Sequence, residues 1–235
     1  MQITGLTLWR DDQLVFKDLN IHSSAHRLGL IGANGAGKSS LLRLMHGLLT
    51  PTSGRVDIAG PTAFLFQSPD QQILFPTVEE EICFGLLELG MSKASARERC
   101  KAILNEMGCP DWMPLACDAL SDGQKQWLSL MALLALEPNT LLLDEPFASL
   151  DLHRSSRLAA RLWSLPQRVI VSSHDLHALA SCDEVIWMNK GQLIMQGSAR
   201  EVIGAYKDAA DAATELAPAN RVGPAAKPSA LAPPE

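Results

Sequence analysis

A long apolar run is missing from this 235-residue chain. The longest candidate, Leu128 to Leu136, is about half of the roughly 18 residues that a membrane-spanning helix needs. The first residues also lack a basic segment followed by an apolar one, so we expect no secretory signal. The chain is therefore expected to be soluble by itself, and other subunits would have to supply any membrane span.

Positive charge is scarce as well. The chain has 20 lysines and arginines against 26 aspartates and glutamates, which leaves a net charge of −6 at pH 7. Binding to nucleic acid in general needs a basic surface, so we expect no nucleic-acid partner. The length and the 47 % of hydrophobic residues are ordinary for one large globular domain or two small ones.

Paired cysteine motifs are absent. The cysteines are odd in number and none is spaced as C-x-x-C: Cys83, Cys100, Cys109, Cys117 and Cys182. This pattern favours reduced, mostly buried thiols in a cytosolic protein over a disulfide framework or a zinc site.

What the chain does contain is a phosphate-binding loop. Residues Gly32 to Ser39 read G-x-x-x-x-G-K-S, after an apolar strand at 27–31 and before a helical segment at 39–45. A glycine loop between a strand and a helix directs backbone N–H groups and a positive helix end at phosphate oxygens. Lys38 would reach the β- and γ-phosphates, and the Ser39 hydroxyl would bind Mg²⁺. The loop predicts a site for a nucleoside triphosphate.

Hydrophobic periodicity predicts an α/β protein. We expect strands at 2–9, 13–22, 27–31, 55–58, 63–66, 140–143, 168–172, 184–188 and from 191, and helices within 39–45, 76–120, 122–136, 152–165, 175–181 and 199–206. This alternation predicts a P-loop NTPase core with a mainly parallel sheet, an N-terminal antiparallel β-subdomain and an inserted helical subdomain at about 76–136. The domain is expected to span 1–206. The Ala- and Pro-rich residues 207–235 are expected to form a largely disordered tail.

Two carboxylates follow an apolar strand. Leu141 to Leu143 precede Asp144 and Glu145, and the end of such a strand lies beside the phosphates in a P-loop sheet. Asp144 could hold Mg²⁺ through water, and Glu145 could polarise an attacking water.

The segment Leu120 to Gln124 reads L-S-D-G-Q and starts a helix. Ser121 and Gln124 have the spacing of a capping box, so one explanation is simply a well-capped helix. The other is that the N–H groups of Ser121 and Gly123 bind a γ-phosphate held by another subunit.

Five motifs occur in one order: the P-loop, L-S-x-G-Q, L-L-L-D-E-P at 141–146, S-L-D at 149–151 and S-S-H-D at 172–175. With this order and spacing the chain resembles the nucleotide-binding subunits of ABC transporters over roughly residues 1–205. The resemblance implies an ATPase that uses ATP and Mg²⁺. It also implies a head-to-tail dimer, in which each ATP lies between the P-loop of one subunit and the L-S-x-G-Q signature of the other.

The resemblance implies a role for each matching residue. The ATP-binding positions are Trp9, Gly32, Asn34, Gly35, Ala36, Gly37, Lys38, Ser39 and Ser40. Trp9 would stack on adenine, unless it is a core residue at the end of a strand. The catalytic group is Lys38, Gln67, Glu145 and His174, and the Mg²⁺ ligands are Ser39, Gln67 and Asp144. Ser149 and Asp151 would couple the two sites, and the signature residues acting in trans are Ser121, Asp122, Gly123 and Gln124.

Asp122 departs from the family, which usually has glycine there. A carboxylate beside a γ-phosphate should repel it, so either Asp122 points away or it slows turnover. In the second case, Asp122→Gly should raise the ATPase rate of the assembled complex.

The segment from Phe66 to Gly85 narrows the resemblance to energy-coupling factor (ECF) ATPases, which drive uptake of vitamins or transition metals. In that family this segment forms a groove for a transmembrane coupling subunit, which works with a substrate-binding membrane subunit. The amino-acid sequence of this segment is most similar to that of biotin systems, with cobalt or nickel systems as the alternative. The chain is thus expected at the cytoplasmic face of the cell membrane, with a second ATPase subunit in a homodimer. Soluble ABC ATPases and non-hydrolysing regulatory modules fit less well.

Overall fold

The computed structural model describes residues 1–148 and 152–216. Its larger sheet contains β3 (Arg27–Ile31), β5 (Thr62–Leu65), β6 (Thr140–Asp144), β7 (Arg168–Ser172), β8 (Glu184–Asn189) and β9 (Gln192–Gly197). The strand order is β5-β6-β7-β3-β8-β9, and only β9 runs antiparallel to its neighbour. Unbroken apolar runs such as Leu141–Leu143 suit strands that are covered on both faces.

A smaller antiparallel sheet is formed by β1 (Gln2–Arg10), β2 (Gln13–His22) and β4 (Ser53–Asp57), in the order β2-β1-β4. β1 and β2 are joined by a two-residue turn in which Asp11 and Asp12 both have positive φ, 48° and 62°. Such turns match the twist of a hairpin, and Asp tolerates this conformation better than most residues. The predicted N-terminal hairpin is confirmed.

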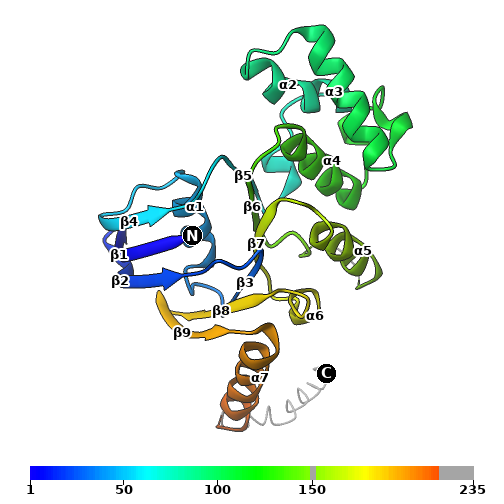
Figure 1. The fold of residues 1–235 in the computed structure, drawn as a ribbon. Helices are drawn as coiled ribbons and strands as arrows, with labels where there is room; N and C mark the ends of the chain where they lie inside the picture. The colour runs from blue at the N-terminus through cyan, green and yellow to red at the C-terminus, as the bar shows by residue number, and fades with distance from the viewer. Residues whose placement is uncertain (149–151, 217–235) are drawn as a thin grey trace, which may run out of the picture.

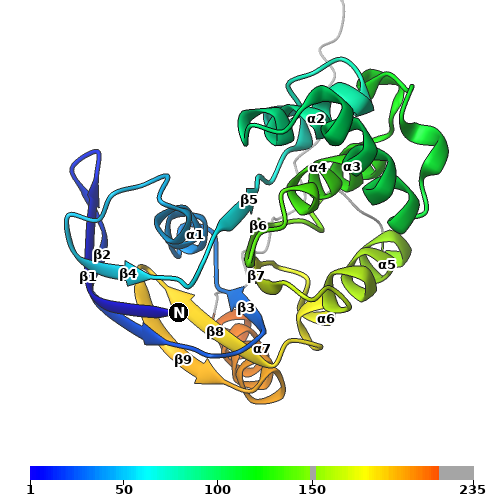
Figure 2. The same ribbon diagram turned by 45° about the horizontal axis from the view of Figure 1, so that its top comes forward.

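The larger sheet separates two hydrophobic cores. Leu142 faces one core, which contains α1 (Lys38–His46) and the inner side of the smaller sheet. Leu141 and Leu143 face the other core, with the remaining helices. Figure 1 shows α1 between the two sheets, and Figure 2 shows the same layers after rotation. The predicted α/β fold class is confirmed.

The inserted helices α2 (Val78–Glu88) and α3 (Lys93–Glu106) stand apart from both sheets in Figures 1 and 2, whereas α4 (Asp122–Ala135) packs between them and β5. Their starts are encoded locally. The Thr77 hydroxyl accepts a hydrogen bond from the N–H of Glu80 at 3.3 Å, and that of Ser92 accepts one from Ser95 at 3.1 Å. Such caps satisfy N–H groups that the first turn of a helix leaves without partners.

The C-terminal helix is longer than predicted. After α5 (Leu152–Trp163) and α6 (Leu176–Leu179), α7 spans Ala199–Leu216, whereas the sequence pattern placed its end at Tyr206. Residues 207–216, assigned to the tail, are rich in alanine and contain no proline, so they favour helix despite their low complexity. Residues 217–235 lie outside the described part of the chain. No helix in the described ranges has the length and hydropathy to cross a bilayer.

The turn between β8 and β9 provides a test of this packing. Gly191 has a φ of +76°, and a Cβ there would overlap the carbonyl oxygen of Val15. A left-handed conformation costs an L-residue about 1–2 kcal/mol, and the overlap adds to that cost. We expect Gly191→Ala to lower the free energy of unfolding by about 2 kcal/mol or more, measured by denaturant unfolding.

Gly204→Ala is the matched control, because Gly204 lies in α7 and nothing lies within 4 Å of the Cβ it would gain. It should raise stability by up to about 1 kcal/mol. Equal unfolding midpoints for the two variants would contradict the close contact between this turn and β2.

Candidate functional site

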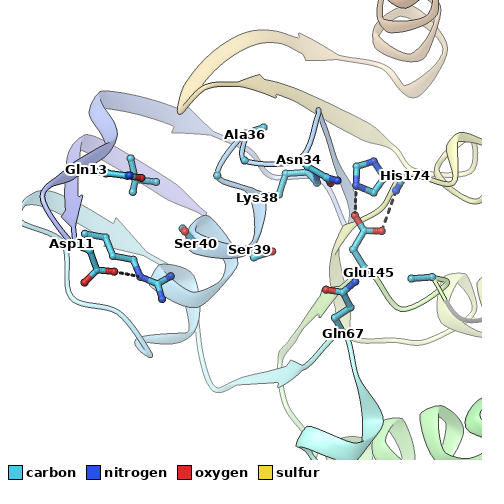
Figure 3. A pocket seen from close by; sticks show the side chains of 15 residues that line it. Asp11, Gln13, Asn34, Ala36, Lys38, Ser39, Ser40, Gln67, Glu145 and His174 are labelled. Atoms are coloured by element: carbon cyan, nitrogen blue, oxygen red, sulfur yellow. Dashed lines mark hydrogen bonds and ion pairs between the residues drawn. The ribbon is translucent and has the colours of Figure 1, made fainter. Parts of the chain in front are cut away.

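A cavity of about 820 Å³, which we call the P-loop cavity, lies where several strands of the larger sheet end. The carboxyl ends of parallel strands meet at one edge, so residues that follow β3, β5, β6 and β7 converge there. Figure 3 shows Gln67, Glu145 and His174 toward one end of this cavity and Asp11 and Gln13 toward the other. The lining residues are Arg10, Asp11, Gln13, Val15, Asn34, Gly35, Ala36, Gly37, Lys38, Ser39, Ser40, Gln67, Glu145, Ala148 and His174.

The P-loop backbone is shaped by glycines with positive φ. Gly32 has a φ of +148°, and a Cβ there would overlap the carbonyl oxygen of Met188. Gly37, at +101°, is the N-cap of α1, and a Cβ there would overlap the Phe16 ring. The loop therefore leads its N–H groups into the start of α1, and the positive end of a helix favours anions.

Lys38 is the buried cation of this cavity, with 7 % of its surface exposed. Its Nζ donates hydrogen bonds to the carbonyl oxygens of Gly32 at 2.7 Å and Ala33 at 3.4 Å. Burial lowers the pKa of Lys38, and the charges of Glu145 and Asp144 act in the opposite direction. The ammonium group is thus held at the loop that would receive phosphates.

Asp144 accepts two hydroxyl hydrogen bonds on one oxygen. The Ser39 hydroxyl donates to Oδ1 at 2.9 Å and the Ser172 hydroxyl donates to the same atom at 2.7 Å. Carboxylate and hydroxyl oxygens are the ligand types that Mg²⁺ prefers. The donor set therefore fits this ion, with nucleotide phosphates as further ligands.

Glu145 is held in a conformation that non-glycine residues seldom adopt, with a φ of +50°. Its N–H donates to the Ser172 carbonyl oxygen at 3.1 Å, and its Oε2 accepts from the His174 N–H at 3.2 Å. The other oxygen, Oε1, lies 3.2 Å from His174 Nε2 but outside hydrogen-bonding geometry, so it has no hydrogen-bond partner among the described residues. A buried acceptor without a partner can accept a hydrogen bond from water.

The other site residues suggested by the sequence fall into three groups. Gln67 lines the cavity with the P-loop and Glu145. Trp9 does not line it; its side chain is 53 % exposed, because the preceding Leu8 points into the core and successive strand residues face opposite sides. The adenine role of Trp9 therefore stays a prediction. Ser149 and Asp151 lie outside the described residues.

The β1–β2 hairpin supplies lining residues that the motifs did not reveal. Arg10 and Gln13 are register partners at the end of this hairpin, and Arg10 Nε lies 3.6 Å from a carboxylate oxygen of Asp11. Their only signal in the sequence was the turn itself, which gives no indication of which cavity it borders.

The L-S-D-G-Q segment borders a second cavity, of about 670 Å³, which we call the signature cavity. The Gln124 side chain accepts a hydrogen bond from the Ser121 N–H at 2.8 Å, so the predicted capping box is present. The lining residues are Met107, Gly108, Cys109, Trp112, Ser121, Gly123, Gln124, Trp127, Arg157, Leu158 and Arg161.

Asp122 is missing from this lining. Its charge acts on the neighbouring Lys125 instead. The pKa of Lys125 is raised first by its hydrogen bond to Asp70, and Asp122 adds to the effect. Asp122 is exposed at the helix start, and its effect on a phosphate bound at the signature stays a prediction.

The family of the chain follows from its match to the model of a known protein family. The model of the ABC transporter family matches residues 17–148, from β2 through the P-loop and signature to the carboxylates after β6. The chain belongs to the ABC transporter family. It is an ATPase, the ATP-binding subunit of such a transporter.

Individual relatives agree with this assignment. The chain is 42 % identical over 218 residues to the biotin transport ATP-binding protein BioM of Rhodobacter capsulatus, covering 88 % of this chain and 93 % of the relative. It is 34 % identical to the energy-coupling factor transporter ATP-binding protein EcfA of Methanoculleus marisnigri, over 83 % and 77 % of the two chains. Among solved structures, cbiO1 from Clostridium perfringens, part of the ABC transporter complex cbiONQ, matches with a TM-score of 0.78 and 26 % identity, over 92 % and 94 %.

The reactivity of the cysteine thiols tests whether the signature cavity is open to solvent. Cys109, which lines it, is half-buried, whereas the other four cysteines are buried. Burial raises the pKa of all five thiols, to about 11 for Cys117 and about 12 for Cys100 and Cys182. Because the thiolate is the reactive form, a maleimide at neutral pH should modify Cys109 first in the folded protein. Mass spectrometry reads the site, and rapid modification of Cys182 before unfolding would contradict the described packing.

Proposed function

We propose that this chain is the ATPase of an ECF-type importer that takes up biotin. The relatives named for biotin transport and for an energy-coupling factor support the type of system. The observation that carries the proposal is a concentration of exposed apolar side chains in the part of the chain that follows Gln67. Six of the ten large hydrophobic side chains exposed in the described residues lie between residues 74 and 115: Leu74, Phe84, Leu87, Leu89, Met91 and Leu115.

We define the docking face as Leu74, Phe75, Phe84 and Leu87. The rings of Phe75 and Phe84 lie 4.8 Å apart, which joins the segment after Gln67 to α2. Phe84 and Leu87 are three residues apart on α2 and so share a side of the helix. A groove of about 360 Å³ continues from Phe75 to Asp70 and Lys125. An apolar face of this kind suits a helix of a transmembrane coupling subunit.

Lys125 connects this groove to the signature helix. Its Nζ lies 2.8 Å from a carboxylate oxygen of Asp70, and Lys125 belongs to the first turns of α4. Through this ion pair, a movement of α4 would be transmitted to the groove that continues from the docking face. The proposed assembly holds the ATPase at the cytoplasmic face of the membrane through the coupling subunit, with a separate membrane subunit binding the substrate.

In the proposed reaction, Lys38 and the P-loop N–H groups bind the phosphates. Ser39, Asp144 and Gln67 would hold Mg²⁺, which neutralises phosphate charge when bound. Glu145 Oε1 accepts a hydrogen bond from the attacking water and orients it, and His174 sits beside the γ-phosphate. Positioning and charge stabilisation supply most of the rate enhancement in phosphoryl transfer.

The signature acts in a homodimer in this proposal. The P-loop cavity and the signature cavity share no lining residue. A head-to-tail pair would bring the P-loop cavity of each copy to the signature cavity of the other, where the start of α4 meets the γ-phosphate. Within this proposal, and by resemblance, Trp9 would stack on adenine.

Hydrolysis is tested with two variants. Lys38→Ala should abolish ATP turnover because it removes the buried cation that binds phosphate. Glu145→Gln should lower kcat by about a hundredfold or more while ATP still binds, since water orientation is lost and the phosphate contacts remain. Phosphate release and binding of a fluorescent ATP analogue measure the two effects. Full turnover in Glu145→Gln would remove Glu145 from the reaction.

The partner is tested by co-purification from membranes. Leu74→Glu, which places a charge on the docking face at a position 72 % exposed, should lower recovery of the transmembrane subunit at least tenfold. Ile194→Glu is the matched control, because Ile194 is exposed on β9 outside this face. Loss of the partner in both variants would argue against a specific face, and no membrane partner in the wild type would favour a soluble ABC ATPase.

The substrate is tested in the same cells by uptake of labelled biotin and of Co²⁺ or Ni²⁺. Biotin uptake should require intact Lys38, while uptake of the metal ions should not. The reverse result would favour a cobalt or nickel system, the second candidate.

A further inference from the structure

The signature cavity contains two arginines from α5 that differ in their surroundings. Arg161 already has partners within the chain. It donates a hydrogen bond to the Met107 carbonyl oxygen at 2.9 Å, and its guanidinium lies 5.6 Å from the centre of the Trp127 ring. Arg157, one turn earlier, is exposed and forms no ion pair or hydrogen bond with the described residues. The cavity therefore holds one arginine that is available to a ligand.

The P-loop cavity, in contrast, has little positive charge. Its cations are Lys38 and Arg10, and Arg10 already faces Asp11. Glu145 lines the same cavity, and Asp144 lies next to it in the chain. ATP remains an anion when it carries Mg²⁺, so these groups alone leave an excess of negative charge. Charge of this kind is costly in a partly dry site unless cations are close.

We propose that Arg157 binds the phosphates of the ATP held in the P-loop cavity of a second copy of this chain. The inference rests on the proposed head-to-tail dimer and deepens it. Arg157 shares its cavity with Ser121 and Gly123, the residues that would meet that nucleotide. A guanidinium can bind phosphate oxygens with two parallel hydrogen bonds, and it keeps its charge at all accessible pH values.

This role distinguishes Arg157 from a surface charge. An arginine supplied by a neighbouring subunit stabilises charge on a triphosphate only after the two halves have closed. Arg157 should therefore contribute to ATP-dependent association and turnover, and not to ATP binding by the monomer. It would also offset Asp122, whose carboxylate stands on the same helix start as Ser121 and Gly123.

The experiment uses Glu145→Gln as the background, because slow hydrolysis should preserve the ATP-bound dimer. Analytical ultracentrifugation with Mg-ATP measures the dimer dissociation constant. Arg157→Ala should weaken the dimer about tenfold or more, and Arg157→Glu should weaken it further. Arg200→Ala is the matched control, since Arg200 is an exposed arginine of α7 outside both cavities.

A second measurement separates a ligand role from a structural one. Binding of a fluorescent ATP analogue at a protein concentration that keeps the chain monomeric should be the same with and without Arg157, and thermal unfolding should be unchanged. A dimer that tolerates Arg157→Glu as well as Arg200→Ala would overturn the role of Arg157 and leave the dimer standing. A Glu145→Gln protein that stays monomeric with ATP would overturn both.

Discussion

Repulsion between a bound triphosphate and the two carboxylates at the end of β6 is the constraint on which the proposed site depends. Asp144 and Glu145 are buried beside the P-loop, where the proposed site would hold the phosphates. Such a site needs positive charge from several directions. Lys38 and the start of α1 supply it from one side, and the oxygens of Asp144 and Ser39 suit a divalent cation. The proposed contribution of Arg157 would come from the opposite side, which makes closure of the dimer part of the charge balance.

The sequence predicted the part of this site that depends on local chain geometry. Asp144 ends a strand, and the P-loop, Glu145 and His174 each follow one; parallel strands bring their carboxyl ends to one edge. The type and order of most elements were also predictable, because apolar periodicity and caps are encoded within each segment. The roles of these residues stay predictions until they are measured.

Features that depend on distant segments could not be read in this way. Arg10 and Gln13 reach the P-loop cavity only because the smaller sheet packs over α1. The signature cavity combines α4 with α5 and residues 107–112, which no motif links. The length of α7 was missed for another reason: alanine-rich composition is shared by helices and by tails, and residues 207–212 are exposed, so no buried apolar stripe marks them as helical.

The tryptophans of the signature cavity give the protein an optical property. Trp112 and Trp127 both line the surface that the proposed dimer would cover. Indole emission depends on water and on neighbouring charges, and Trp127 lies beneath a guanidinium. Nucleotide-driven closure would therefore change the native fluorescence of the chain, so that its working cycle could be followed in real time without any attached label.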